Sequence, residues 1–147
     1  DSRLEIKEFL MDPQQGDISN VAALTAEPTR YRTDLRLEFG DAPEQRLPKC
    51  ASGHHALSAD QEVEFATDGS VATKWCIIHE GKPVIWEMDA GGVPVHPTTY
   101  RLTSAEDVPG RDPRTWKLEG SMDGKIWTLL DEHRRAGRQA GRFRLYR

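Results

Sequence analysis

Short runs in which apolar and polar residues alternate dominate this sequence. In each run the apolar positions recur every second residue, which places them on one face of an extended strand. The runs are Leu35 to Phe39, Val84 to Met88, Tyr100 to Leu102, Trp116 to Leu118 and Phe143 to Leu145. Such alternation is typical of antiparallel strands with one face against a core. The segment from Trp127 to Leu130 is apolar on both faces except at Thr128, which predicts a central strand.

Turn-forming dipeptides separate these runs and are placed as in a sandwich or barrel. They include Asp68-Gly69, Gly91-Gly92, Pro109-Gly110 and Asp123-Gly124. The last of these lies between two strand patterns and predicts a tight hairpin. Helical signals are few. Residues 18–28 could hold a short helix, and residues 131–141 could form one turn, which Gly137 and Gly141 weaken. The pattern therefore predicts an all-β, antiparallel β-sandwich.

Length and composition fit one folded domain covering residues 1–147. The chain is 37% hydrophobic and 30% charged, as expected for a globular domain with a solvated exterior. No apolar run approaches the roughly 20 residues of a membrane helix, and no signal-peptide pattern opens the chain. The net charge is −4, with basic residues concentrated between Arg134 and Arg147. A nucleic-acid-binding protein would usually carry a broader basic surface, so we expect no nucleic acid as partner.

The two cysteines, Cys50 and Cys76, leave two alternatives open. They could form one bridge between two loops, or both could be buried free thiols. There is no Cys-x-x-Cys metal-binding spacing. Cysteine usage therefore does not settle the redox compartment.

One stretch is specific enough to indicate a family. Residues 66–75 read Ala-Thr-Asp-Gly-Ser-Val-Ala-Thr-Lys-Trp. This resembles the signature Ala-x-Asp-Gly-x-x-x-Thr-Lys-Trp of discoidin domains, also called coagulation factor V/VIII type C domains. The chain also resembles the second part of this signature. The matching positions are residues 100–107, 109–113, 116–121, Asp123-Gly124 and Trp127. This part has the form common in bacterial carbohydrate-binding modules of family 32, and the match covers residues 65–131.

The resemblance implies a jelly-roll sandwich similar to the galactose-binding domains. Trp75 and Trp116 would then pack in the core. We take Leu35 to Phe39 as the first strand of the family pattern, in preference to Ile6 to Phe9. Residues 1–30 would then form an additional N-terminal strand and connection. The segment after Leu130 is shorter than is usual in the family, so we expect a late strand to be rearranged or truncated before the closing strand at residues 142–147.

Calcium is the cofactor that the resemblance implies. Family members often hold one structural calcium ion (Ca²⁺) beside the Asp-Gly turn, with oxygen ligands. Asp68 and Thr73 occupy the matching positions, and Glu38 or Glu8 could supply another carboxylate. Many relatives have a second Asp where this chain has Ser70, which lowers the local negative charge. The alternative is an Asx turn without a metal.

A glycan-binding site in similar modules lies on loops at one end of the sandwich. His54 and His55, on the loop from Pro48 to Gln61, and Arg111, on another loop, are the candidate ligand-binding residues. Each has a plain structural alternative, and for Arg111 the structural role is favoured. The arginines from Arg134 to Arg147 could bind an acidic group, but a solvated loop followed by the polar face of a strand is the favoured explanation.

These expectations lead to a non-catalytic carbohydrate-binding module that belongs to a larger glycan-active or surface protein. Its partner would be a glycan or glycoprotein, as in lectins and cell-adhesion proteins, and it would act outside the cell or at its surface. The alternative is a protein–protein interaction or structural module within an assembly. We expect no enzyme, because the sequence has none of the familiar catalytic motifs. A phospholipid-binding variant would need apolar loop tips, and the His54 loop offers only Leu57.

Overall fold

The structure, a computed structural model, describes residues 6–10, 20–29, 32–39, 48–70, 72–89, 99–105, 109–134 and 143–146. Within these ranges every strand pairing is antiparallel. The helical elements there are three short 3₁₀ helices, η1 (Ala59–Gln61), η2 (Val63–Ala66) and η3 (Pro109–Arg111). The prediction of an all-β, antiparallel sandwich is confirmed.

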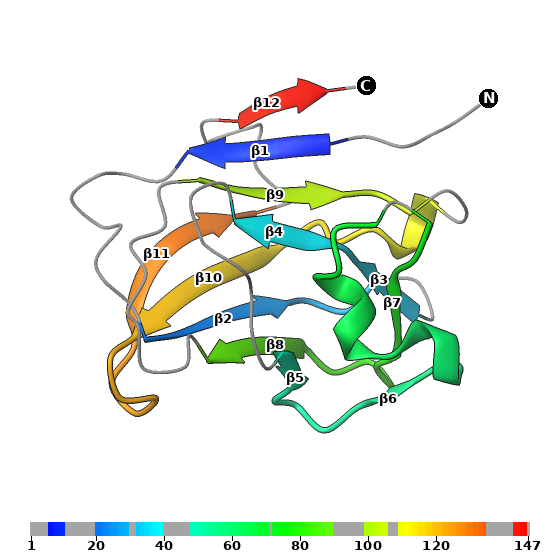
Figure 1. The fold of residues 1–147 in the computed structure, drawn as a ribbon, viewed down its shortest axis with the longest axis horizontal. Coiled ribbons are helices and arrows are strands. Elements are labelled where there is room, and N and C mark those ends of the chain that lie inside the picture. The colour runs from blue at the N-terminus through cyan, green and yellow to red at the C-terminus, as the bar shows by residue number, and fades with distance from the viewer. Residues whose placement is uncertain are drawn as a thin grey trace.

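Two larger sheets and one small sheet make up the fold (Figure 1). The five-stranded sheet has the order β11 (Thr128–His133), β10 (Trp116–Ser121), β2 (Val21–Ala26), β8 (Val84–Asp89), β5 (Pro48–Cys50). The four-stranded sheet has the order β12 (Phe143–Tyr146), β1 (Ile6–Leu10), β9 (Thr99–Thr103), β4 (Leu37–Phe39). The small sheet has the order β3 (Arg32–Leu35), β7 (Trp75–Ile78), β6 (His55–Ala56). It lies with η1 and η2 at one end of the molecule.

Apolar side chains from both larger sheets form the core. Leu24, Trp86 and Leu118 of the five-stranded sheet are fully buried, as is Tyr100 of the four-stranded sheet. The ring of Phe39 on β4 lies with its centroid 6.0 Å from that of Trp86 on β8. Strand β8 shows the predicted alternation, because its buried and less buried positions follow each other from Val84 to Met88. Burial on one face therefore holds these strands in their register.

The helix suggested for residues 18–28 is wrong, because Val21–Ala26 forms β2 at the centre of the five-stranded sheet. Four of its residues, Ala22, Ala23, Leu24 and Ala26, are buried. Burial on both faces removes the alternation that marks a half-buried strand, and alanine by itself favours helix. Pairing with β10 on one side and β8 on the other overrides that local preference.

The alternating run from Leu35 to Phe39 is not one strand. Strand β3 ends at Leu35 in the small sheet, and β4 begins at Leu37 in the four-stranded sheet. Arg36 lies between them, buried, and its backbone carbonyl accepts a hydrogen bond from the N–H of Thr103 (3.2 Å). The chain thus passes from one sheet to another at Arg36, which places this residue at the junction where the candidate site lies.

The segment from Trp127 to Leu130 is not a central strand. Strand β11 begins at Thr128 and forms an edge of the five-stranded sheet, so Leu129 is 42% exposed. This strand continues through His133, in place of the helical turn suggested for residues 131–141, of which residues 135–141 lie outside the described part. The adjacent apolar residues Leu129 and Leu130 therefore belong to an edge strand, with Leu129 exposed, and not to a central strand.

The turn at Asp123-Gly124 joins β10 and β11 through residues 122–127, a longer loop than the tight hairpin expected. The Ser121 hydroxyl oxygen accepts hydrogen bonds from the N–H groups of Asp123 and Gly124. Asp123 Oδ1 accepts from the N–H groups of Lys125 and Ile126 (2.8 and 3.0 Å). These hydrogen bonds to the carboxylate lower the pKa of Asp123. Side-chain capping, and not a two-residue turn, therefore closes the hairpin.

Both terminal segments contribute strands to the sandwich. Residues 1–30, expected to add a strand and a connection, supply β1 and the central strand β2. The closing strand expected within residues 142–147 is β12, which pairs with β1. Strand β1 pairs with β9 on its other side. The first strand is therefore an inner strand of its sheet.

Candidate ligand-binding cleft

An open cleft of about 260 Å³ lies where the small sheet meets η1 and η2. Its lining combines charged, amide, hydroxyl and aromatic side chains from four parts of the chain: Arg36, Asp60, Gln61, Phe65, Ala72, Thr73 and Lys74. Five of these seven residues are polar or charged, so the cleft is more polar than most small-ligand sites, in which apolar side chains predominate. It is larger than the neighbouring cavity described below.

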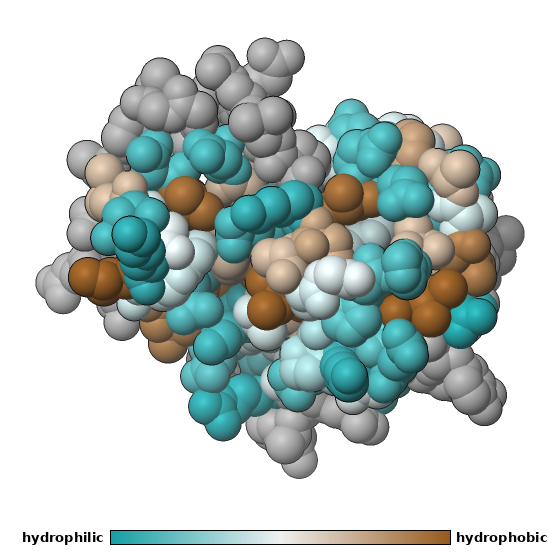
Figure 2. All heavy atoms as spheres, turned by 90° about the horizontal axis from the view of Figure 1, so that it is seen from below, coloured by the Kyte–Doolittle hydropathy of each residue, from teal (hydrophilic) through white to brown (hydrophobic). Residues whose placement is uncertain are grey.

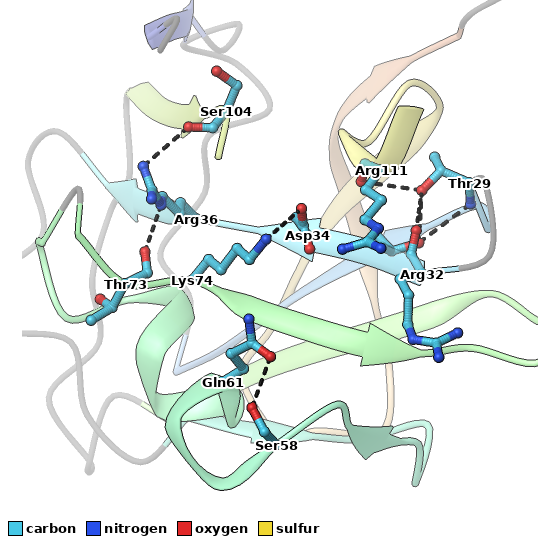
Figure 3. A network of polar contacts seen from close by, with 11 residues as sticks. Thr29, Arg32, Asp34, Arg36, Ser58, Gln61, Thr73, Lys74, Ser104 and Arg111 are labelled. Atoms are coloured by element: carbon cyan, nitrogen blue, oxygen red, sulfur yellow. Dashed lines mark hydrogen bonds and ion pairs between the residues drawn. The ribbon is translucent and has the colours of Figure 1, made fainter. Parts of the chain in front are cut away.

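Arg36 forms one wall of the cleft and ties it to the sandwich. Its Nε donates to the carbonyl of Thr73 (2.5 Å) and its Nη1 donates to the carbonyl of Ser104 (3.1 Å). Figure 3 shows the guanidinium bridging these two segments. Arg36 lies at the break between β3 and β4. The junction between the two sheets therefore determines the position of this wall of the cleft.

Lys74 lies beside Arg36 and is held by a buried carboxylate. Its Nζ is 3.0 Å from Asp34 Oδ2, and the two side chains are only 9% and 1% exposed. Figure 3 shows the ammonium group turned from the cleft wall toward Asp34 on β3. A buried charge is tolerated only when an opposite charge or hydrogen bonds compensate it. The pair therefore anchors the cleft wall to the small sheet.

The opposite wall is formed by η1 and η2. The Ser58 hydroxyl donates to Asp60 Oδ1 (2.5 Å) and lies 2.9 Å from Gln61 Oε1. In Figure 3 the amide nitrogen of Gln61 points away from Ser58, toward the side on which Lys74 lies. Phe65 on η2 is half-buried and supplies the aromatic surface. The hydrogen bond from Ser58, the residue before η1, thus orients the Asp60 carboxylate before any ligand arrives.

A smaller cavity of about 70 Å³ shares Arg36 with the cleft and brings together two predicted metal ligands, Glu38 and Asp68. Asp68 Oδ1 accepts from the N–H of Ser70 (2.9 Å), which is the Asx turn, and Oδ2 accepts from the Thr73 hydroxyl. Gly69 has the expected positive φ of 76°. Glu38 Oε1 accepts from Arg101 Nη1 (3.0 Å). Thr73 itself lines the larger cleft, so its hydroxyl reaches Asp68 from that side.

Glu38 and Asp68 offer carboxylate oxygens to a hard cation, but Arg36 also lines this cavity and Arg101 is ion-paired with Glu38. Among the described residues, no three His, Cys, Asp or Glu side chains are grouped as a metal site. A cation there would need the carboxylates of Glu38 and Asp68 together with hydroxyl or carbonyl oxygens. Side chains on β1, including the alternative ligand Glu8, lie outside the description.

The predicted ligand-binding residues His54, His55 and Arg111 line neither hollow. His54 Nδ1 lies 2.8 Å from the Ser52 hydroxyl, which also accepts from the N–H of Ile85. His55 is exposed on β6. Arg111 belongs to η3, where its carbonyl accepts from the Thr29 hydroxyl (3.1 Å). Their role in ligand binding stays a prediction.

Sequence reasoning did not find Asp60, Gln61 and Phe65. The candidate residues were chosen from the family signature and from expected loops. Asp60, Gln61 and Phe65 instead lie on short 3₁₀ helices, which have no periodic pattern. Trp75 and Trp116 are buried, as expected, and so offer no exposed ring for stacking. Trp127, which precedes β11, is partly exposed. The signal that the sequence offered was an aromatic residue, Phe65, three positions before Asp68-Gly69.

Exposed apolar side chains gather on the β10–β11 hairpin. Met122, Ile126 and Leu129 are 53%, 77% and 42% exposed. On the face seen in Figure 2, hydrophobic side chains form separate small groups between hydrophilic ones. Leu57, the apolar residue considered for a phospholipid contact, is also exposed. No helix in the described part of the chain is long and apolar enough to cross a bilayer.

Both cysteines are free thiols, and their surroundings differ. Cys50 is partly exposed, whereas Cys76 is fully buried opposite Asp34 in the β3–β7 register. Burial, together with the Asp34 carboxylate, raises the pKa of the Cys76 thiol to about 11.

We therefore expect one thiol to react with Ellman's reagent at pH 8 in the native protein, and two in denaturant. The thiolate is the reactive form, and both burial and a raised pKa withhold it at Cys76. Cys50→Ser should abolish the native reaction and Cys76→Ser should not. No reaction even in denaturant without reductant would instead indicate a bridge.

The comparisons with known proteins give one short similarity. A 34-residue segment is 56% identical to a peptide-N(4)-(N-acetyl-beta-glucosaminyl)asparagine amidase of Arabidopsis thaliana. It covers 22% of this chain and only 5% of the Arabidopsis protein. No family model matches the chain, and no solved structure matches it. The chain thus spans a small fraction of the protein that it resembles.

Proposed function

We propose that this chain is a non-catalytic carbohydrate-binding module of the discoidin type, part of a larger glycan-active or surface protein that acts outside the cell. The observation that carries this proposal is the cleft, which Phe65 lines together with hydrogen-bonding groups of both charge signs. Sugars are recognised by an aromatic surface for their C–H faces and by polar groups for their hydroxyls. The signature at residues 66–75 adds support, since it crosses this site.

The short similarity also indicates which sugar to try first. The name of the Arabidopsis protein refers to N-acetylglucosamine linked to asparagine. A neutral sugar bearing an acetamido group would offer hydrogen-bond partners for Gln61 and an apolar face for Phe65. We therefore choose chitobiose, the disaccharide of N-acetylglucosamine, as the first probe.

Phe65→Ala is expected to weaken chitobiose binding at least about ten-fold, because it removes the aromatic surface, worth roughly 1 kcal/mol beyond its buried area. Isothermal titration calorimetry on the folded domain measures the dissociation constant. Ile126→Ala, which also removes an apolar side chain but on the β10–β11 hairpin, is the control and should bind like the wild type. Equal affinity of the Phe65→Ala variant would remove the cleft from consideration.

The alternative function, a protein-interaction module, has its own observation in the exposed residues Met122, Ile126 and Leu129. Apolar side chains gathered on an edge hairpin are typical of protein contacts. If the folded wild-type domain binds no neutral or acidic glycan, this alternative becomes the better one.

We further propose that the cavity between Glu38 and Asp68 holds the calcium ion that the family resemblance implies. A bound cation there would join β4 to the turn at residues 68–73 and so stabilise one wall of the cleft. The few carboxylates predict weak affinity.

Addition of Ca²⁺ is expected to raise the free energy of unfolding, by about 2.7 kcal/mol at a concentration 100 times the dissociation constant. This corresponds to an increase in melting temperature of several degrees. Differential scanning calorimetry with Ca²⁺ or with chelator measures it. Asp68→Asn should lose the response, whereas Asp123→Asn, a capping aspartate on the distant hairpin, should keep it. If the melting temperature does not change with Ca²⁺, the calcium proposal is wrong and Asp68 serves only to form the Asx turn.

A further inference from the structure

The charged groups around the cleft leave no excess of positive charge, and this balance indicates which glycans it accepts. We infer that the cleft selects neutral sugars and discriminates against acidic ones. The inference rests on the proposed carbohydrate-binding function and adds a specificity to it. The relevant charges are those that line the cleft and the carboxylates directly behind its wall.

Two cations and two carboxylates meet at this place. Arg36 and Lys74 line the cleft together with Asp60, and Asp34 lies behind the wall. The formal charges of these four groups sum to zero, and the Asp68 carboxylate, which accepts from the Thr73 hydroxyl, adds one negative charge behind the same wall. In a site partly shielded from water, each charge is felt more strongly than in bulk solvent, so the sum matters for any charged ligand.

Lys74 and Arg36 both already bind groups of the protein. The Lys74 ammonium is 3.0 Å from Asp34 Oδ2, and Asp34 is almost completely buried. An acidic ligand that drew Lys74 away would leave the Asp34 carboxylate buried and uncompensated, which is costly. Arg36 directs its Nε and Nη1 to the carbonyls of Thr73 and Ser104. Withdrawing it would break the contacts that hold the cleft wall.

Asp60 opposes an acidic ligand more directly. Its carboxylate is exposed at the cleft, oriented by the hydrogen bond from Ser58. A second carboxylate nearby would be repelled, whereas a sugar hydroxyl can donate to it. Gln61 presents the free end of its amide to the same space. The polar groups are therefore suited to hydroxyl and amide partners, and Phe65 lines the same cleft.

Galabiose and digalacturonic acid test this inference, because they share a linkage and differ in carrying hydroxymethyl or carboxylate groups; chitobiose is the second neutral probe. We expect at least one neutral disaccharide to bind. Its dissociation constant should change less than about two-fold between roughly 20 and 300 mM NaCl, because a neutral sugar has no net charge for salt to screen. Digalacturonic acid should bind at least about ten-fold more weakly than that neutral disaccharide, and Asp60→Asn should narrow this gap. Asp123→Asn removes the same charge from the distant hairpin and should leave the gap unchanged.

The outcomes separate the two proposals. Tighter binding of digalacturonic acid, or neutral-sugar affinity that falls steeply with salt, would overturn the charge-balance inference while keeping a glycan-binding module. An unchanged gap in Asp60→Asn would also contradict it. If none of the three disaccharides binds to the folded domain, the proposed function fails, and the specificity inference fails with it.

Discussion

Replacement of Lys74 by methionine is expected to lower the free energy of unfolding by about 3–5 kcal/mol, because it leaves the Asp34 carboxylate buried without its cation. The two side chains are 9% and 1% exposed, so water cannot take the place of the ammonium group. Methionine keeps most of the volume of lysine, which separates the loss of charge from the loss of packing. For a domain of this size the melting temperature should fall by roughly 10 °C.

Lys49→Met is a matched control for this prediction. Lys49 also lies 3.0 Å from a carboxylate, that of Glu87, but its side chain is 65% exposed. A solvated ion pair contributes little, so we expect a change below about 1 kcal/mol. Urea denaturation of both variants measures the difference. In the double variant Lys74→Met, Asp34→Leu, removal of the orphaned carboxylate should restore most of the lost stability. Equal effects of Lys74→Met and Lys49→Met would show that Asp34 is hydrated.

The second large effect is expected at Trp116. Its indole is buried, its Nε1 donates to the Tyr100 hydroxyl (2.9 Å), and its ring is stacked on His133 with centroids 4.4 Å apart. The Tyr100 hydroxyl in turn donates to Asp131 Oδ2 (2.6 Å). Burial and the Asp131 carboxylate raise the pKa of Tyr100 well above its usual value, so the phenol remains a donor. This chain of contacts joins β10, β9 and β11.

Trp116→Ala is therefore expected to cost about 3–5 kcal/mol, because it creates a cavity in the core. Trp116→Phe keeps an aromatic ring and loses the indole donor, which should cost roughly 1–3 kcal/mol. Thermal and urea denaturation measure both. Because Trp116 does not line the ligand-binding cleft, Trp116→Phe should retain chitobiose affinity. Loss of binding with little loss of stability would instead make this signature tryptophan a ligand-contacting residue.

Local patterns were sufficient for some elements and misleading for others. Val84 to Met88 was recognisable because one face is buried and the other is not. Strand β2 was not recognisable from the sequence, because burial on both faces hides the alternation. Its alanines suggested a helix instead. Arg36 continued an alternating run, yet the chain changes sheets there. A strand pattern describes which faces are buried, and it does not say which sheet each residue joins.

The candidate site shows the same division. Asp68 and Glu38 were predicted as neighbours through the family signature, and they line one cavity. The cleft beside them joins Arg36, two residues of η1, Phe65 of η2 and Lys74, which no spacing in the sequence connects. Of the predicted ligand-binding residues, His54 contacts Ser52, His55 is exposed on β6 and Arg111 belongs to η3, and none of the three lines either hollow. Residue type identified candidates, and packing selected among them.

The sequence by itself determined that this chain forms an antiparallel sandwich with buried tryptophans and an Asp-Gly turn, since alternation and turn chemistry act between residues close along the chain. Only the tertiary structure decided where the chain changes sheets, which strands lie at an edge, and which side chains share a hollow. Those features depend on pairing between distant segments, such as β3 with β7, where Asp34 meets Lys74. The free energy of such contacts arises only when the segments are brought together.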